Sequence, residues 1–146
     1  VSDNTATGDY GFGGAIYSEG RLTARRCWFT FNQSTGYRGG AIVLDGAVTD
    51  PLSVVEDTRF DNNAAFSDGG AVCVLSAPLQ ISRCRFESNQ AGGDSYSSGG
   101  GIYNIYGDVR VDNSLFENNR ALGADGGGGA LYAYGAASLV NCTLYN

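Results

Sequence analysis

Two short phrases of apolar and small residues alternate along the chain at a nearly constant spacing. In the first, a glycine pair and a small residue precede an aliphatic residue, and successive copies lie 26, 30, 30 and 29 residues apart. These aliphatic positions are Ile16, Ile42, Val72, Ile102 and Leu131. The second phrase, Phe-x-x-Asn, recurs between the copies of the first. Self-similarity at a fixed period indicates units that stack on one another to share a core.

Apolar positions within each period alternate with a spacing of two residues, which predicts β-strands rather than helices. We expect three short strands per coil: one at the glycine phrase, one running into the Phe-x-x-Asn phrase, and one after the Asn. Each residue then lies about 4.8 Å above its counterpart. The sequence predicts an all-β fold, a right-handed single-stranded parallel β-helix (β-solenoid) of about five coils of 26–31 residues. Residues 1–146 are expected to form a single β-helix segment, a fragment of a longer repeat array.

Stacking predicts two interior ladders. Side-chain amides of the repeated asparagines are expected to hydrogen-bond to each other and to the backbone at a turn, where Asn tolerates the left-handed conformation. This asparagine ladder comprises Asn4, Asn32, Asn63, Asn89 and Asn119. The core phenylalanine stack comprises Phe29, Phe60, Phe86 and Phe116. The glycine pairs are expected to form another corner, where backbone crowds backbone.

The outer face of the glycine-phrase strand carries a mixed column. Because successive side chains of a strand point to opposite faces, the residue after each inward aliphatic residue is expected to point outward. This outward column is Tyr17, Val43, Cys73, Tyr103 and Tyr132. The candidate contact surface is an aromatic group composed of Tyr17, Tyr103, Tyr132 and Tyr134. Such tyrosines bind sugar rings or a protein partner, or form cross-strand stacks, and the structural role is the preferred interpretation.

The two phrases in fixed phase resemble the repeats of the polymorphic outer membrane proteins of chlamydiae, and the resemblance covers essentially the whole chain. It implies the β-helical passenger of an autotransporter that mediates adhesion. Similar repeats occur in many large surface proteins of bacteria and some protists. The resemblance is therefore more specific to the type of repeat than to function.

Composition and charge remove several classes of function. The net charge is −6, so there is no basic patch to neutralise the phosphates of nucleic acid or of an anionic membrane. Histidine is absent, which removes the commonest general base and zinc ligand. No apolar stretch approaches the ~18 residues of a membrane span. We expect no cofactor, no metal, no nucleic acid partner and no membrane-spanning segment in this fragment.

The cysteines are predicted to be free. Cys27, Cys84 and Cys142 share one column and recur every second coil, which places neighbours about 9–10 Å apart. A disulfide needs Cα atoms within about 7 Å. We expect these three to be buried thiols that fill a slot for small side chains. Cys73 lies on another strand and is expected to face outward or into a loop, as an inert surface thiol.

One group of charged and polar residues near the second strand is the only candidate for acid/base or Ca²⁺ chemistry. Stacking places Arg25 beside Glu56, and Arg26, Asp57 and Arg83 in one row. The full group is Arg25, Arg26, Glu56, Asp57, Arg83, Asp112 and Asn113. The repeats are regular, whereas an active site breaks the local pattern. We therefore interpret the group as a charge-complementary ladder and expect no catalytic residue.

These observations predict a non-enzymatic extracellular or cell-surface scaffold for adhesion or surface assembly, associated with the outer membrane if the source is bacterial. Its expected partners are a protein or glycan at a cell surface, or copies of itself. Variable loops at residues 35–38, 47–52, 92–98 and 122–127 are expected near one corner, where they carry the contacts. Two alternatives stay open: a segment of an extracellular structural filament, and a polysaccharide-binding or polysaccharide-degrading β-helix.

Overall fold

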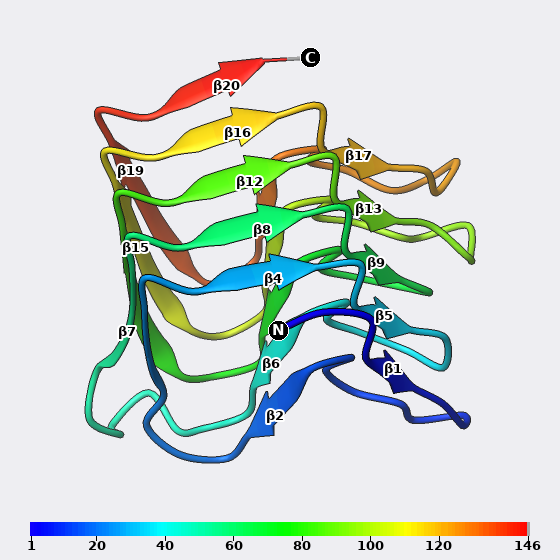
Figure 1. Ribbon diagram of the computed structural model, residues 1–146, viewed down its shortest axis with the longest axis horizontal. Coiled ribbons are helices and arrows are strands. Elements are labelled where there is room, and N and C mark those ends of the chain that lie inside the picture. The colour runs from blue at the N-terminus through cyan, green and yellow to red at the C-terminus, as the bar shows by residue number, and fades with distance from the viewer. Residues whose placement is uncertain (146) are drawn as a thin grey trace.

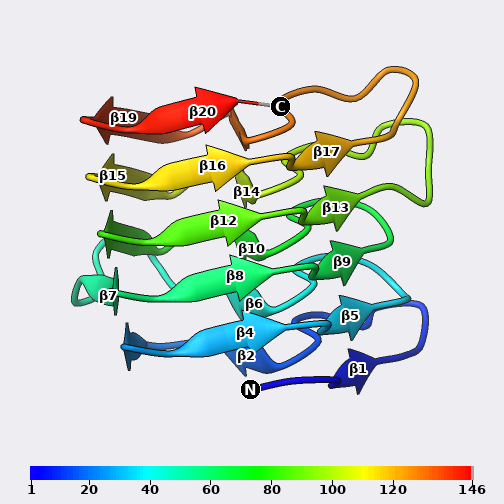
Figure 2. The same cartoon turned by 45° about the horizontal axis from the view of Figure 1, so that its top comes forward.

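The structure, a computed structural model, describes residues 1–145. Within these residues the chain forms twenty short β-strands whose pairings are all parallel. They make four five-stranded sheets along a common axis, and each coil adds one strand to each sheet (Figure 1, Figure 2). The fold is a parallel β-solenoid of about five coils, as predicted. No helix in the described part of the chain is long and apolar enough to cross a membrane.

Each sheet is named here after its first strand, and its strands are given in stacking order. The β1 sheet contains β1 (Thr5–Ala6), β5 (Gln33–Ser34), β9 (Ala64–Ala65), β13 (Gln90–Ala91) and β17 (Arg120–Ala121). The β2 sheet contains β2 (Ile16–Ser18), β6 (Ile42–Leu44), β10 (Val72–Val74), β14 (Ile102–Asn104) and β18 (Leu131–Ala133). The β3 sheet contains β3 (Thr23–Arg25), β7 (Ser53–Glu56), β11 (Pro78–Ser82), β15 (Asp108–Asp112) and β19 (Ala136–Val140). The β4 sheet contains β4 (Trp28–Thr30), β8 (Arg59–Asp61), β12 (Arg85–Glu87), β16 (Leu115–Glu117) and β20 (Thr143–Tyr145).

Each described coil has four strands, one more than predicted, because the expected second strand divides in two. One residue in the left-handed conformation separates the β3 sheet from the β4 sheet in every coil, with φ between 48° and 52°. These residues are Arg26, Asp57, Arg83, Asn113 and Asn141. A left-handed residue turns the chain and interrupts the hydrogen-bonded ladder. The apolar alternation continues on both sides of the turn, which is why the sequence pattern reads as one strand.

The ladder asparagines lie at the bend between the β4 and β1 sheets. The Nδ2 of each of the first four donates to the Oδ1 of the next at 2.9 Å. The prediction that these asparagines are left-handed is wrong, because the residue before each of them takes that conformation. These preceding residues are Asp3, Phe31, Asn62, Ser88 and Asn118, with φ between 53° and 57°. Turning the chain one residue earlier aims the Asn amide into the coil, where backbone and amide partners lie.

Phenylalanines stack at the centre of the coil. Neighbouring rings in the column Phe29, Phe60, Phe86 and Phe116 have centroids 5.1, 4.7 and 4.7 Å apart and are nearly parallel. All four are at most 1% exposed. The aliphatic residues of the β2 sheet and the inward residues of the β3 sheet pack around them in one core. Burial of these side chains is the main favourable term for folding.

The glycine pairs form a tight corner before the β2 sheet, as predicted. The first glycine of each pair is left-handed, with φ of 66° at Gly39 and 67° at Gly69. The second lies against the backbone of the next coil, so that a Cβ on Gly40 would overlap the carbonyl oxygen of Gly70. Glycine is required at both positions, for conformation at the first and for close approach at the second.

The outer face of the β2 sheet is covered, which corrects the prediction for Cys73. Val43 and Cys73 are 0% exposed and Tyr103 is 7% exposed, and they form a second apolar cluster outside the coil. Cys73 is therefore a buried thiol and not a surface one. The covering residues include Phe12 and Arg38, both from the loops that follow the β1 sheet. The Arg38 guanidinium lies above the Tyr103 ring.

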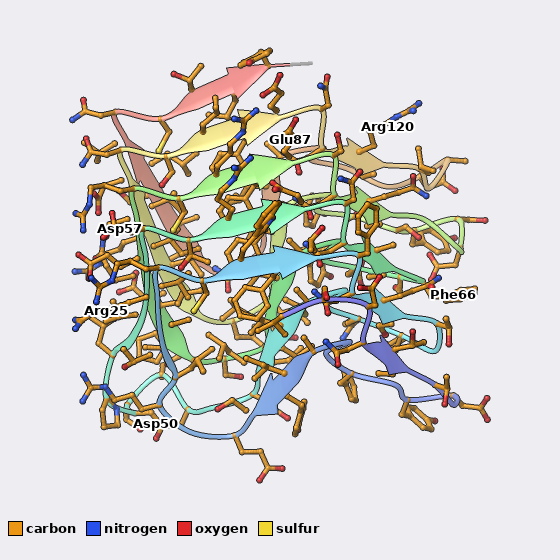
Figure 3. The ribbon with its side chains drawn as sticks, viewed as in Figure 1. Arg25, Asp50, Asp57, Phe66, Glu87 and Arg120 are labelled. Atoms are coloured by element: carbon orange, nitrogen blue, oxygen red, sulfur yellow. The ribbon has the colours of Figure 1, made fainter. Side chains whose placement is uncertain are left out.

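We call the loops that follow the β1 sheet the corner loops. They project from one side of the rod in Figure 1, and residues 35–38, 92–98 and 122–127 belong to them. Residues 47–52 instead connect β6 to β7, so the expectation of a common corner is wrong for this segment. Figure 3 shows Asp50 on the side of the rod opposite Phe66 of a corner loop. Each coil has four bends at which residues can be inserted. The repeat period alone does not show at which of these bends an insertion lies.

Candidate functional site

The charged residues predicted on the second strand form a ladder of ion pairs. Glu56 accepts from Arg25 Nε at 2.9 Å and also pairs with Arg83. Arg83 Nε lies 2.7 Å from Asp57 Oδ1, and this hydrogen bond lowers the pKa of the Asp57 carboxyl. Arg26, Asp57 and Arg83 occupy one column, the left-handed bend position of successive coils. Within this row Arg83 bridges Glu56 and Asp57, whereas Arg26 makes no ion pair among the described residues. All these groups are substantially exposed or lie at the surface, where such pairs contribute little to stability.

The acid/base candidates of this ladder lie apart. Glu56 and Asp112 occupy the same register on β7 and β15, and Ser82 of β11 separates them. Asp112 accepts hydrogen bonds from Gln80 Nε2 at 2.5 Å and from Asn113 Nδ2 at 2.7 Å. Each carboxylate is therefore already bonded to its neighbours.

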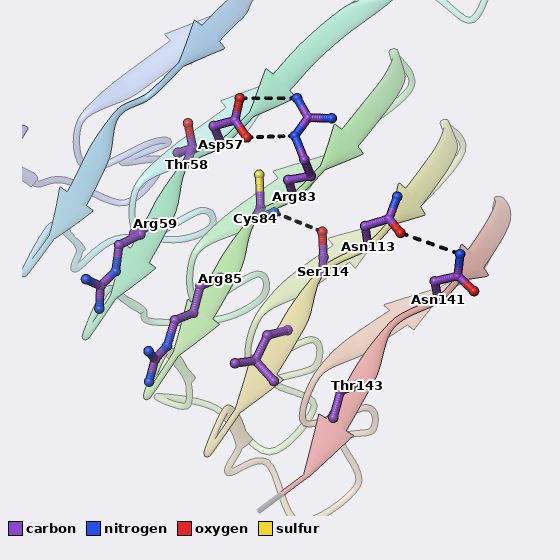
Figure 4. A pocket seen from close by; sticks show the side chains of 11 residues that line it. Asp57, Thr58, Arg59, Arg83, Cys84, Arg85, Asn113, Ser114, Asn141 and Thr143 are labelled. Carbon is purple, nitrogen blue, oxygen red and sulfur yellow. Dashed lines mark hydrogen bonds and ion pairs between the residues drawn. The ribbon is translucent and has the colours of Figure 1, made fainter.

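An open groove of about 660 Å³ runs along the bend between the β3 and β4 sheets (Figure 4). Its basic residues are all ion-paired: Arg83 with Glu56 and Asp57, Arg85 with Glu87 and Glu117, and Arg59 with Asp61 and Glu87. Beside them lie the amides of Asn113 and Asn141, which stack in the same column. The groove holds compensated charge and carries no strong attraction for a ligand of either sign.

One member of the predicted cysteine column, Cys84, lines this groove. Cys84 is buried, and Cys27 and Cys142, nearer the two ends, are partly buried. All four cysteines of the described residues are free. The Sγ of Cys84 donates to the carbonyl of Ser82 at 3.2 Å, and burial raises its pKa to about 11. A thiol that stays protonated at neutral pH is a poor nucleophile.

A second hollow, the tyrosine pocket, lies where the corner loops meet the covered face of the β2 sheet. It encloses about 380 Å³. Five tyrosines line it, together with four charged residues and two serines. The lining is Tyr37, Tyr96, Tyr103, Tyr132, Tyr134, Arg38, Asp68, Asp94, Asp125, Ser67 and Ser98.

The tyrosine pocket brings together three of the four predicted contact tyrosines. Tyr103 and Tyr132 stack with centroids 5.7 Å apart and 9° between their planes, and Tyr134 packs edge-on to Tyr132 at 5.2 Å. Burial raises the pKa of Tyr103, and the adjacent Tyr134 hydroxyl raises that of Tyr132. Tyr17 lies elsewhere, with its hydroxyl donating to Asp45 Oδ2 at 2.6 Å. The cross-strand stack of Tyr103 and Tyr132 and the exposed ring of Tyr134 therefore lie in the same pocket.

Arg38 and Asp68 fix the inner wall of the pocket. Arg38 Nε lies 2.8 Å from Asp68 Oδ2, and the two side chains are 20% and 6% exposed. Asp68 Oδ1 also accepts from the backbone N–H of Ser98 at 3.0 Å. The guanidinium lies over the rings of Tyr37 and Tyr103, 4.3 and 5.6 Å from their centroids. Such a shielded, multiply bonded pair orders the loops that carry it.

Two further carboxylates stand at the outer rim. Asp94 and Asp125 are exposed and line the pocket. Asp94 Oδ1 accepts from the backbone N–H of Tyr96 at 2.9 Å, which fixes the loop conformation. Among residues 1–145, neither carboxylate takes part in an ion pair. The described residues hold no group of three or more His, Cys, Asp or Glu side chains suited to a metal ion.

The loops predicted to carry contacts contain Tyr37, Arg38, Tyr96, Asp94 and Asp125, but the sequence singled out none of these residues, and Asp68 lies outside the predicted ranges. One signal was available. Each of the first four corner loops carries an aromatic residue shortly before its glycine pair, Tyr10, Tyr37, Phe66 and Tyr96, and the first loop also carries Phe12. Aromatic residues repeated in otherwise polar loops indicate a surface for contacts on this side of the rod.

Comparisons with known proteins agree with the repeat. Residues 1–19 and 113–134 match the family described as the Chlamydia polymorphic membrane protein repeat. The chain is also similar to the probable autotransporter YfaL of Escherichia coli (strain K12), with 37% identity over 151 residues. This alignment covers 90% of the chain and 12% of that protein. The chain therefore spans about an eighth of the length of this relative. No solved structure matches the chain.

Proposed function

We propose that the chain, a β-solenoid that matches the Chlamydia polymorphic membrane protein repeat at residues 1–19 and 113–134, is a surface-exposed, non-enzymatic segment of an adhesive passenger. Its rod holds the corner loops away from a cell surface, and these loops contact a protein or glycan on another cell. The similarity to a probable autotransporter supports the surface location. The partner is recognised through the tyrosine pocket.

One observation carries the proposal. Along most of the rod, polar side chains are bonded to their own ladder, as the asparagines and the ion pairs at the bend are. At the tyrosine pocket this pattern changes, because exposed aromatic edges and unpaired carboxylates meet in a hollow between loops. Aromatic residues with a few polar groups in a concave site are typical of binding surfaces.

The non-enzymatic part of the proposal is supported by the bonding of the acidic residues. Glu56 and Asp57 are ion-paired with arginines, and Asp112 is held by two amides. Assays of uronate and neutral glycans, with and without Ca²⁺, test this directly. We expect no turnover. Turnover that disappears in Glu56→Gln or Asp112→Asn would contradict the proposal.

Adhesion is tested by loop exchange in the natural full-length protein displayed on cells. Residues 92–98 and 122–127 are replaced by Gly-Ser segments of equal length, and binding to cultured host cells and to matrix proteins is counted. The matched control replaces residues 47–52, an insertion at a different bend of the same rod. We expect the corner-loop exchanges to reduce binding and the control to retain it. Equal binding by all variants removes the corner loops from the function.

A further inference from the structure

We infer that the tyrosine pocket binds an organic cation, an ammonium or guanidinium group presented by the partner. The inference rests on the proposed function for the exposure of the corner loops to a partner, and it specifies the chemistry recognised there. The cation comes from a lysine or arginine side chain of a protein or from a free polyamine, and both sources present the same group.

Exposed ring surface is the first requirement for such a site. Tyr96 is 73% exposed and Tyr134 is 70% exposed, and both line the pocket. Tyr134 packs edge-on to Tyr132, so the two rings form an angled wall and not a flat stack. The face of an aromatic ring carries negative charge density that attracts a cation within about 6 Å of its centroid.

Charge is the second requirement. The pocket contains three carboxylates, Asp68, Asp94 and Asp125, and one guanidinium, that of Arg38, which leaves a net charge of −2. Arg38 compensates Asp68 through the 2.8 Å contact. The remaining charge resides on Asp94 and Asp125, which have no ion-pair partner in residues 1–145. A cation is therefore attracted, and sialylated or uronate glycans are repelled.

The inner half of the pocket already holds a cation in this manner. The Arg38 guanidinium lies over two tyrosine rings, at 4.3 Å from the Tyr37 centroid, and pairs with the carboxylate of Asp68. The outer half offers the same components, tyrosine rings and carboxylates, without a resident cation among the described residues. A ligand cation there completes a second copy of the arrangement that the chain makes for itself.

The size of the hollow favours an organic cation over a metal ion. The described residues contain no group of three or more His, Cys, Asp or Glu side chains that could hold a metal. A volume of about 380 Å³ accommodates an alkylammonium or guanidinium group with part of its chain. Ring faces attract both ammonium and guanidinium groups, and the planar, weakly hydrated guanidinium also stacks on them.

The test uses the full-length protein with ¹³C-labelled tyrosine rings and follows ring resonances during titration. The probes are spermidine, N-acetyl-lysine methylamide and N-acetyl-arginine methylamide, with lactose and sialyllactose as neutral and anionic counterparts. We expect shifts at Tyr132 and Tyr134 with the cations, and weaker binding as salt rises. Tighter binding of the amino acid derivatives than of spermidine identifies a protein side chain as the source.

Two variants report on the two requirements. Tyr134→Ala removes an exposed ring, and Asp125→Asn removes a rim charge whose side chain has no hydrogen bond among the described residues. We expect each to weaken cation binding about two- to fivefold. The controls are Tyr106→Ala, an equally exposed tyrosine outside the pocket, and Asp9→Asn, an exposed carboxylate of another corner loop. The controls should bind as the unaltered protein does.

The outcomes separate this inference from adhesion. Lactose binding without cation binding, or no shift with any probe, overturns the inference, and adhesion lost on loop exchange still supports the proposed function. Cation binding at Tyr132 and Tyr134 with unchanged adhesion in the loop variants supports the inference and overturns the proposed role of the loops. Equal affinity in Asp125→Asn and the unaltered protein removes the charge argument.

Discussion

The middle rung of the asparagine ladder is the most informative position to perturb. Asn63 is 0% exposed and uses its whole amide. Its Nδ2 donates to Asn89 Oδ1 at 2.9 Å and to the carbonyl of Phe29 at 3.0 Å. Its Oδ1 accepts from the backbone N–H of Asn32 at 3.0 Å and from Asn32 Nδ2 at 2.9 Å. We predict that Asn63→Ala strongly destabilises the fold.

The magnitude follows from the groups that alanine leaves behind. The backbone N–H of Asn32 loses its acceptor, and the carbonyl of Phe29 loses this donor. The Nδ2 of Asn32 keeps a hydrogen bond to the carbonyl of Val1. A buried polar group left without its partner costs about 1–3 kcal/mol. We therefore expect the free energy of unfolding to fall by about 4 kcal/mol, a large share of the ~5–15 kcal/mol of an ordinary domain.

Equilibrium urea unfolding, followed by far-ultraviolet circular dichroism, measures this loss. The matched control is Asn4→Ala, which removes the same amide from the first, exposed rung, where water replaces the lost partner. We expect the control to cost less than about 1 kcal/mol. Equal losses for the two variants would refute the reasoning, because the cost of removing an amide would then not depend on whether its rung is buried.

An isosteric variant separates hydrogen bonding from shape. Asn63→Asp keeps the size of the side chain but replaces a donor by an acceptor that faces the Phe29 carbonyl and Asn89 Oδ1. A buried carboxylate in this position favours its protonated form, so its pKa is raised. The destabilisation is therefore greatest at neutral pH and decreases on acidification through that pKa. A pH-independent loss would show that packing, and not the amide donor, is what the rung requires.

Three further results are expected. Phe86→Ala, at the centre of the phenylalanine stack, should cost about 3–5 kcal/mol in urea unfolding, because the stacked rings on either side cannot fill the cavity. Iodoacetamide should label native Cys142 well before Cys84, which is buried and has a pKa raised to about 11, and equal rates would contradict this burial. Absorbance at 295 nm should show Tyr17 ionising near pH 12, because its hydrogen bond to Asp45 raises its pKa, and Asp45→Asn should bring the transition closer to pH 10. The stability from this bond is present below pH 10 and is lost as pH rises toward 12.

The stacking of equivalent residues was predictable because it depends on identity at fixed intervals. Phe60 lies opposite Phe86 and Ile42 opposite Val72 in the paired strands, as the period requires. A shift of one residue would move every apolar side chain to the other face, so alternation fixes the register. The glycine corner was predictable for a similar reason, since only glycine fits beside the neighbouring backbone.

The division of the coil into four strands was less accessible from sequence. The bend between the β3 and β4 sheets is made by Arg26, Asp57, Arg83, Asn113 or Asn141. Asp and Asn favour the left-handed conformation and Arg does not, so the turn signal is present in three of the five coils and absent from two. At the asparagine bend the left-handed position is likewise occupied by unlike residues, Phe31 among them. The surrounding ladder imposes these conformations on whatever residue is present. Local preference therefore reveals the bends with Asp or Asn and not those with Arg, Phe or Ser.

What the sequence determined by itself is the interior: the period, the facing of the strands, the asparagine and phenylalanine columns, and hence the solenoid. Each of these follows from residues that contact their own counterparts one coil away. What only the tertiary structure decided is the exterior, including the burial of Cys73, the covering of Tyr103 and the assembly of the tyrosine pocket from four coils. Those contacts join residues at different phases of the repeat, and they depend on the path of loops whose lengths vary. The repeat period does not determine the path of these loops.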